Sequence, residues 1–131
     1  ALSAIEAQAA TSRIDVLTVD GTIVPIITDY IDRGIRQAED ENATALIIEL
    51  NTPGGLLGST EEIVQRIMNA DVPIVVYVSP KGAWAASAGT FITLAGHIAA
   101  MTPGTTIGAA HPVAGGGHSD RHPRPGLGEG P

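Results

Sequence analysis

Three short apolar runs, separated by helix-like stretches, constrain the fold of this 131-residue chain more than any other feature. Residues 14–19 alternate polar and apolar side chains, whereas residues 45–50 and 73–78 are almost continuously apolar and rich in valine and isoleucine. Runs of this length are typical of strands, and continuous ones are typical of strands buried in a parallel sheet. Because helical patterns connect the runs, the sequence predicts an α/β fold with right-handed crossovers.

Both connecting stretches have the apolar period of a helix. The first runs from Pro25 to about Asp40, and its expected inward face consists of Ile26, Ile27, Tyr30, Ile31, Ile35 and Ala38. In the second, Ser59 or Thr60 is suited to cap the helix N-terminus. The expected inward face of this second helix consists of Ile63, Ile67 and Met68.

The spacing of apolar residues is less regular after residue 82. Residues 83–95 are small, apolar and compatible with a helix that has Ser87 near its start. Residues 98–101 are expected to form a short strand, and residues 102–106 a turn. The composition changes after Pro112, where glycine, proline, histidine and charged residues dominate.

This change in composition suggests three segments. We expect an N-terminal tail over residues 1–13, one domain over residues 14–113, and a Gly/Pro-rich, disordered tail over residues 114–131. The opening residues leave an alternative, because AQA at residues 7–9 has the small-x-small form of a signal-peptide cleavage region.

Charge and composition narrow the possible functions. Fourteen acidic residues against seven basic ones give a net charge of −7, which disfavours nucleic acid as a partner. The chain contains no cysteine, which excludes disulfides, thiolate metal sites and cysteine nucleophiles. No apolar run approaches the roughly 20 residues that a membrane-spanning helix requires.

Two segments contain residues suited to catalysis. The first is NTPGG at residues 51–55, directly after a predicted buried strand, where ligands of α/β sheets bind. Its two glycines leave backbone N–H groups accessible and could border an oxyanion hole. The alternative interpretation is an ordinary Pro-Gly turn.

The second segment is GAWAASAGT at residues 82–90, where Ser87 lies among small residues at the expected start of a helix. The partial positive charge of a helix N-terminus would favour a developing oxyanion, so Ser87 is a candidate nucleophile. The alternative is that Ser87 only caps the helix.

A serine nucleophile also requires a base, and the candidates are Lys81, His97, His111, His118 and His122. No spacing favours a Ser-His-Asp triad over other arrangements. A metal site formed by the last three histidines has no companion pattern in the sequence, so we predict no metal.

Four motifs in this order resemble a known family. They are LNTPGG at residues 50–55, PIVVYV at 73–78, GAWAASAGT at 82–90 and AMTPGTTIGAAHP at 100–112. They resemble the NfeD family of membrane-associated ClpP-class serine proteases, which are similar to signal peptide peptidase A. The resemblance extends from about residue 14 to residue 113 and implies a ClpP/crotonase fold of stacked β-α-β units.

The resemblance also implies a mechanism and a site. Ser87 would be the nucleophile, Gly54 and Gly55 would border the oxyanion hole, and the N–H groups of Gly55 and Ala88 would be its donors. Family members hydrolyse peptides through an acyl-enzyme with a Ser-Lys dyad, so no cofactor is expected. Their substrates are apolar peptide segments, and their partners include stomatin-like membrane proteins.

The family lysine lies downstream of the serine, but residues 115–131 contain no lysine. Lys81 is the only lysine and precedes the serine. The chain is therefore expected to be truncated before the catalytic lysine, with the ClpP-like fold incomplete at its C-terminal end. Full-length relatives carry transmembrane helices, so we expect membrane association, an extracytoplasmic protease domain and homo-oligomers.

Two alternatives to a peptidase remain. One is a catalytically inactive ClpP-fold module for binding or oligomerisation, which the absence of the family lysine favours. The other is a crotonase-like protein that binds acyl-CoA, since the fold and the oxyanion hole are shared. The variant Ser87→Ala separates them, because it would abolish hydrolysis by a peptidase and leave binding by a module intact.

Overall fold

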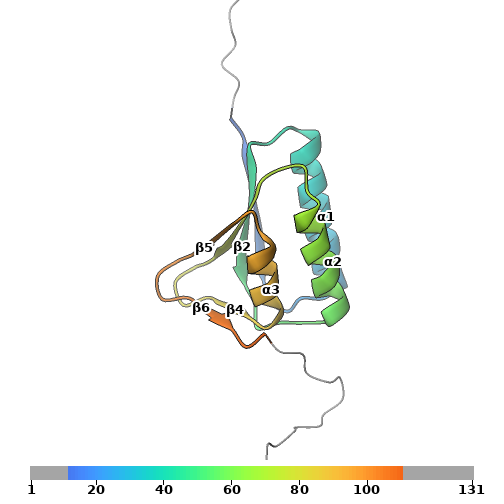
Figure 1. Cartoon of the computed structure of the whole chain (residues 1–131). Coiled ribbons are helices and arrows are strands. Elements are labelled where there is room, and N and C mark those ends of the chain that lie inside the picture. Colours follow the sequence, from blue (N-terminus) through green and yellow to red (C-terminus); the bar gives the residue numbers. More distant parts are fainter. Residues whose placement is uncertain (1–11, 111–131) are drawn as a thin grey trace, which may run out of the picture.

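The computed structural model describes residues 12–110 of the chain. The elements in chain order are β1 (Ile14–Asp20), α1 (Pro25–Asp40), β2 (Ala45–Asn51), α2 (Leu57–Met68), β3 (Ile74–Val78), β4 (Trp84–Ala86), α3 (Ala88–Ala95), β5 (Ile98–Met101) and β6 (Thr106–Gly108). Figure 1 shows their arrangement. The expected C-terminal tail and nearly all of the expected N-terminal tail lie outside the described residues.

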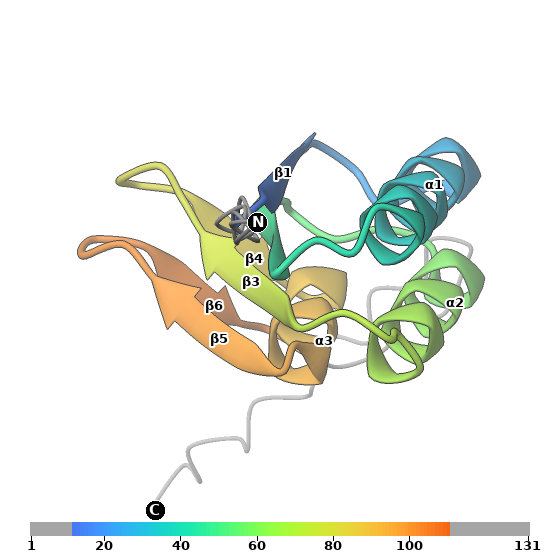
Figure 2. The same ribbon diagram turned by 90° about the horizontal axis from the view of Figure 1, so that it is seen from above.

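Four strands form one parallel sheet in the order β1-β2-β3-β5, and β4 and β6 form a second, two-stranded parallel sheet. The three helices lie on one face of the larger sheet (Figure 2). Helices in the connections between its strands return the chain to the next parallel strand. The predicted α/β fold with a parallel sheet is therefore confirmed.

The hydrophobic core lies between the larger sheet and the helices. Alternate residues of β2 and β3 are fully buried: Leu46, Ile48, Leu50, Ile74, Val76 and Val78 face the helices. The other face of the sheet is more open, since Val16 in β1 is 53% exposed and Ile98 in β5 is 58% exposed. The strands expected to be buried are therefore buried on their helix-facing side.

Helix α1 has the predicted limits, and Ile31, Ile35 and Ala38 are buried as expected. Ile26 does not belong to this inward face, because it is 71% exposed. At 3.6 residues per turn, Ile26 lies about 140° around the helix from Ile31. It lines a shallow outer hollow together with Asp29 and Arg33.

Helix α2 begins at Leu57, earlier than the cap predicted at Ser59 or Thr60. Its start is fixed by long-range pairing, because the N–H of Leu56 donates to the carbonyl of Ile23 at 2.9 Å. Thr60 then lies within the first turn, where its hydroxyl donates to the Leu56 carbonyl at 2.8 Å. Met68, predicted to face the core, is 66% exposed.

Residues 84–86 form strand β4 instead of the start of a helix. The extension of β2 holds them in place, since Thr52 N–H donates to the Trp84 carbonyl and Ala86 N–H donates to the Thr52 carbonyl. Their other edge pairs with β6. The sequence did not predict this strand; it predicted only a turn over residues 102–106. Non-local backbone pairing thus overrides the helix propensity of these alanines.

A network of ion pairs and hydrogen bonds connects α1, α2 and the segment between α2 and β3. Arg66 donates from Nε to Asp32 Oδ1 at 2.7 Å and from Nη2 to Glu39 Oε1 at 2.5 Å. Glu39 Oε2 also accepts the N–H of Asp71 at 2.8 Å. The hydrogen bond from Arg66 holds the pKa of the Glu39 carboxyl below its ordinary value. Burial alone would raise this pKa, and the hydrogen bond from the Asp71 N–H lowers it further.

We expect Glu39→Gln to lower the free energy of unfolding near neutral pH by about 1–2 kcal/mol, because an ionised acceptor of two hydrogen bonds is lost. A carboxyl whose pKa is lowered in the folded state stabilises that state above its unfolded pKa, and this contribution disappears as the pH falls through the folded pKa. Urea unfolding should therefore show a difference between the two proteins that begins to shrink as the pH falls below the ordinary glutamate pKa of about 4.3 and disappears only below the lowered folded pKa. Glu61→Gln, an exposed change of equal charge, should show no comparable difference at neutral pH.

Candidate active site

The site lies where the chain leaves the carboxyl end of β2 and passes between two other segments. On one side, Gly55 forms a parallel bridge with Ile23. On the other side, Thr52 forms a parallel bridge with Ala85 in β4. Because β4 leads directly into Ser87, this pairing brings the Pro-Gly-Gly turn and the serine together.

Both glycines of the turn occupy positions where a side chain would not fit. Gly54 has φ +126°, and a methyl group on it would lie 2.9 Å from Ser87 Cβ and 3.4 Å from Ser87 Oγ. A methyl group on Gly55 would lie 2.1 Å from the carbonyl oxygen of Ile23. The turn is therefore specific for glycine, and one of its glycines lies directly against the candidate nucleophile.

Thr52 holds the turn in shape. Its side chain is 1% exposed, and its Oγ1 lies 3.1 Å from the N–H of Gly54 and 3.2 Å from the carbonyl oxygen of Gly54. The hydroxyl thereby satisfies the buried Gly54 N–H, which has no strand partner.

Ser87 occupies a sharp turn between β4 and α3, with φ +53° and ψ −112°. Its N–H donates to the carbonyl of Gly108 at 2.8 Å, and its carbonyl accepts the N–H of Thr90 at 3.0 Å. Within residues 12–110 its hydroxyl makes no hydrogen bond, and it does not cap α3. A non-glycine residue in this region of φ and ψ is strained, and such strain is concentrated at functional sites.

Thr90 secures this turn from within α3. Its Oγ1 lies 3.0 Å from the carbonyl oxygen of Ala85 and 2.9 Å from that of Gly108. Ala85 lies just before Ser87 in β4, and Gly108 in β6 accepts the Ser87 N–H. The threonine therefore connects the helix to both strands that position the serine.

Two backbone donors remain available next to the serine. The backbone of Ile23 donates its N–H to the Gly54 carbonyl and accepts the N–H of Leu56, so the N–H of Gly55 between them points away from Ile23. This Gly55 N–H has no acceptor among residues 12–110. The N–H of Ala88 is the first of α3 and has no acceptor among these residues either. Small residues surround both donors, which leaves room for a bound peptide carbonyl.

Of the five candidate bases, the structure describes Lys81 and His97; His111, His118 and His122 lie outside the described residues. Lys81 lies in the loop between β3 and β4, which projects from the body of the domain (Figure 1). Its side chain packs beside Gly104 and lines a polar hollow with Asp20 and Glu49. Strand β4 separates this loop from Ser87, so the two are not brought together.

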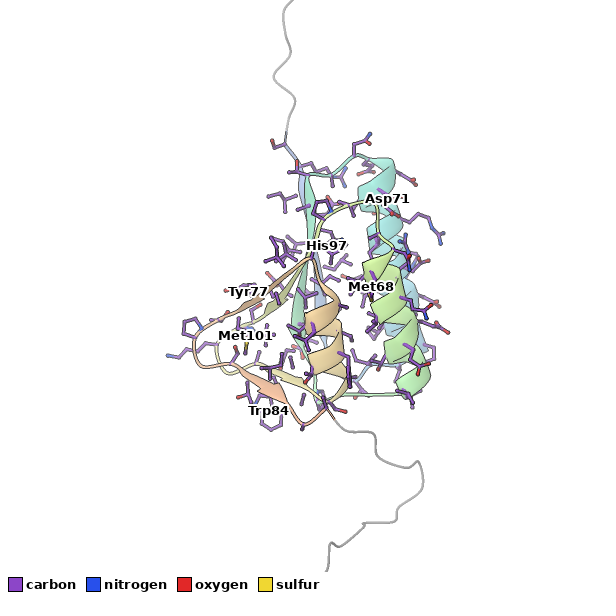
Figure 3. All side chains as sticks on the ribbon, in the orientation of Figure 1. Met68, Asp71, Tyr77, Trp84, His97 and Met101 are labelled. Atoms are coloured by element: carbon purple, nitrogen blue, oxygen red, sulfur yellow. The ribbon has the colours of Figure 1, made fainter. Side chains whose placement is uncertain are left out.

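His97 lies at the opposite end of α3 from Ser87. Figure 3 shows it at the end of the sheet away from Trp84, which precedes the serine turn. The eight residues of α3 separate the two positions by about 12 Å at 1.5 Å per residue. Its Nδ1 accepts the N–H of Ile74 at 3.0 Å, so His97 has the packing role that the sequence left open.

The described part of the chain also contains no cluster of three or more histidine and carboxylate side chains that could hold a metal ion. None of the helices within it is long and apolar enough to span a membrane.

Two residues that position the site carried no clear signal in the sequence. Thr52 lies within the NTPGG motif and Thr90 ends the GAWAASAGT motif, but threonines are common near turns and helix starts, so neither was singled out. Only the long-range contacts reveal that their hydroxyls hold Gly54 and the Ser87 turn.

Ser87 thus lies on a turn between a strand and a helix, and this turn faces the Gly-Gly turn. The family to which the whole domain is similar agrees with this arrangement. The family model described as NfeD1b, N-terminal domain, matches residues 13–122. The chain belongs to this family. The resemblance drawn from the four sequence motifs is thereby confirmed.

A curated relative in this family is described as membrane-bound protease PH1510 from Pyrococcus horikoshii. It is 50% identical over 100 residues, which cover 76% of this chain and 23% of that protein. The chain therefore spans about a quarter of the length of this relative.

Solved structures of 1510-N, described as a membrane-bound stomatin-specific protease, have the same fold. A serine-to-alanine mutant is 45% identical with a TM-score of 0.81, covering 85% of this chain and 54% of the solved chain. A lysine-to-alanine mutant in complex with a substrate peptide is 48% identical with a TM-score of 0.78, covering 80% and 48%.

A more distant similarity concerns the fold alone. ClpP1 from Listeria monocytogenes is 21% identical with a TM-score of 0.66, covering 72% of this chain and 55% of that one. The predicted ClpP-like fold is therefore confirmed.

Proposed function

We propose that this chain supplies the nucleophile and the oxyanion-binding groups of a serine endopeptidase of the Ser-Lys type. One observation carries the proposal: the Ser87 hydroxyl lies on a strained turn, without a hydrogen-bond partner in residues 12–110, in contact with a turn that only glycine can form. Strand-to-helix turns of this kind expose the nucleophile of other serine hydrolases.

In this mechanism, Ser87 Oγ attacks the carbonyl carbon of a peptide bond and transfers its proton to a neutral lysine amine. The N–H groups of Gly55 and Ala88 stabilise the oxyanion of the tetrahedral intermediate. Departure of the amine leaves an acyl group on Ser87, and water activated by the same base hydrolyses it. The N-terminus of α3 adds favourable electrostatic potential at the oxyanion.

The base is proposed to be a lysine outside residues 1–131, because Lys81 is the only lysine of the chain and lies in the projecting loop. Two features of the relatives support a Ser-Lys pair. The 1510-N structures include a serine-to-alanine mutant, and a lysine-to-alanine mutant was captured with a substrate peptide.

We further propose that the substrates are apolar segments of membrane-associated proteins and that a stomatin-like membrane protein is a partner. The support is the description of 1510-N as membrane-bound and specific for stomatin. We also propose that the complete protein is associated with a membrane, which the description of 1510-N supports, and that this domain lies on the extracytoplasmic side. We also propose that the domain forms homo-oligomers.

The test measures hydrolysis of a set of apolar-rich peptides by the 131-residue chain and by its Ser87→Ala variant. Each reaction is run with and without a small primary amine, which takes the place of the lysine side chain. We expect the amine to accelerate hydrolysis by the parent, and Ser87→Ala to reduce the accelerated rate by at least about 100-fold. Labelling by a fluorophosphonate, which reacts with activated serines, should show the same difference. Equal rates or equal labelling of both proteins would exclude Ser87 as the nucleophile.

A second candidate is a binding module without catalysis, favoured by the position of the only lysine in a loop separated from Ser87 by β4. In this case the amine would not accelerate hydrolysis. Parent and Ser87→Ala would bind apolar peptides with the same affinity, which fluorescence anisotropy of labelled peptides measures.

A further inference from the structure

Strand β2 changes its neighbour at Asn51, the first residue of the NTPGG motif. Up to Leu50 the neighbour is β3, and the N–H of Ser79 donates to the Leu50 carbonyl at 3.3 Å. From Thr52 onward the neighbour is β4, since the Thr52 N–H donates to the Trp84 carbonyl at 2.6 Å. Asn51 therefore lies at the point where one neighbouring strand ends and the other begins.

This change of neighbour leaves one backbone donor without a strand partner among the residues that the structure describes. The N–H of Trp84 lies on the edge of β4 that faces Thr52, because the Trp84 carbonyl bonds on that edge. A continued parallel ladder would pair this N–H with the Leu50 carbonyl, but that carbonyl accepts the N–H of Ser79 instead. The side chain of Asn51 supplies the acceptor, with its Oδ1 2.9 Å from the Trp84 nitrogen.

The other end of the Asn51 amide faces the end of β1. Its Nδ2 lies 3.4 Å from Oδ1 of Asp20, which pairs with Asn51 in the sheet. A backbone N–H can only donate and an ionised carboxylate can only accept, so the two partners require a side chain that offers one acceptor and one donor. The amide meets both requirements and connects the end of β1 to the start of β4.

The start of β4 determines where Ser87 lies. The strand has only three residues, and Ser87 follows it directly. Residues 51–54 and 84–87 lie side by side and touch at both ends. At one end the Asn51 amide holds the Trp84 N–H, and at the other end Gly54 lies against the serine. A shift of β4 at Trp84 would therefore change the contact between Ser87 and Gly54.

We propose that Asn51 is a positioning residue of the active site, whose side-chain amide holds the start of β4 and thereby keeps Ser87 in place against Gly54. This inference rests on the proposed function, in which Ser87 is the nucleophile. It adds a residue that touches neither the substrate nor the reacting atoms and acts only through the backbone that carries the serine.

Amine-accelerated labelling of Ser87 by a fluorophosphonate tests the proposal. Asn51→Leu keeps the size of the side chain but removes the acceptor, and it should slow labelling at least about tenfold, because a nucleophile displaced by about 1 Å can lose about 100-fold. The double variant Asp20→Asn with Asn51→Asp exchanges the two side chains, so that an acceptor for Trp84 and a donor–acceptor pair with residue 20 are both kept. It should label within about twofold of the parent.

Asn69→Leu is the matched control. Nδ2 of Asn69 donates to the Gln65 carbonyl at 2.8 Å at the end of α2, so this variant also loses one hydrogen bond from an asparagine side chain to the backbone. It should lose stability in urea as Asn51→Leu does and label at the parent rate. Equal labelling by Asn51→Leu and Asn69→Leu, or a double variant as slow as Asn51→Leu, would overturn the proposal. If Asn51→Leu does not fold, Asn51→Ser, with a polar side chain one bond shorter, replaces it.

Backbone amide NMR separates this inference from the proposed function, because it does not require Ser87 to react. The Trp84 N–H should exchange with solvent at least about tenfold faster in Asn51→Leu than in the parent or the double variant, and only Asn51→Leu should shift the Ser87 resonance. An unchanged Ser87 resonance in Asn51→Leu would contradict the role of Asn51 even if Ser87 is reactive. A parent that shows no labelling at Ser87 but gives these NMR differences would contradict the proposed function and still support the positioning of Ser87 by Asn51.

Discussion

Gly55→Ala is expected to remove a large part of the stability of the domain. A methyl group at this position would lie 2.1 Å from the carbonyl oxygen, 2.6 Å from the nitrogen and 2.6 Å from the Cβ of Ile23. Ile23 is fully buried and cannot yield, so the two segments must separate. The cost combines overpacking of about 1–3 kcal/mol with the loss of two backbone hydrogen bonds of about 1 kcal/mol each. A total of about 3–5 kcal/mol is a large fraction of the stability of a small domain.

Urea unfolding followed by circular dichroism measures this effect, and Gly58→Ala is the matched control. Gly58 lies in the first turn of α2 and does not have a positive φ, and no atom lies within 4 Å of the place that an added methyl group would occupy. Alanine favours a helix over glycine, so this variant should be as stable as the parent or slightly more stable. Similar losses in both variants would show that the contact with Ile23 is not the cause.

The sequence predicted those elements whose pattern is local. The limits of α1 agree with its apolar period, and the runs at residues 45–50 and 73–78 form β2 and β3. Strands β4 and β6 were missed because pairing with Thr52 and with each other holds them in place. No local pattern among alanines and glycines contains that information. The same limit applies to the start of α2, which pairing with Ile23 determines.

The sequence predicted some parts of the candidate site but not others. The order of the motifs pointed to Ser87 and the Gly-Gly turn, and the structure places Gly54 against the serine. The supporting hydroxyls of Thr52 and Thr90 could not be predicted, because they depend on contacts between segments distant in the sequence. These hydroxyls connect the fold to the site, since both threonines fix backbone groups next to the serine.

Gly54→Ala is expected to retain the fold but to lower the reactivity of Ser87. The added methyl group would lie 2.9 Å from Ser87 Cβ, which side-chain rotation cannot move, so the backbone of one of the two residues must shift. The backbone at φ +126° adds a strain of about 1–3 kcal/mol for any residue with a side chain. Because displacement of a nucleophile by about 1 Å can cost about 100-fold, amine-accelerated labelling of Ser87 by a fluorophosphonate should slow by about this factor.

Gly21→Ala separates displacement of the serine from strain in the backbone. Gly21 has φ +125°, almost the same as Gly54, but no atom lies within 4 Å of the position of its added methyl group. Both variants should therefore lose stability in urea unfolding through the same backbone strain, with a further loss in Gly54→Ala from its contact with Ser87, whereas only Gly54→Ala should label slowly. Equal labelling rates in the two variants would mean that contact between Gly54 and Ser87 does not control the serine. Slow labelling in Gly54→Ala alone would show that the absence of a side chain at residue 54 is what keeps the nucleophile in its reactive position.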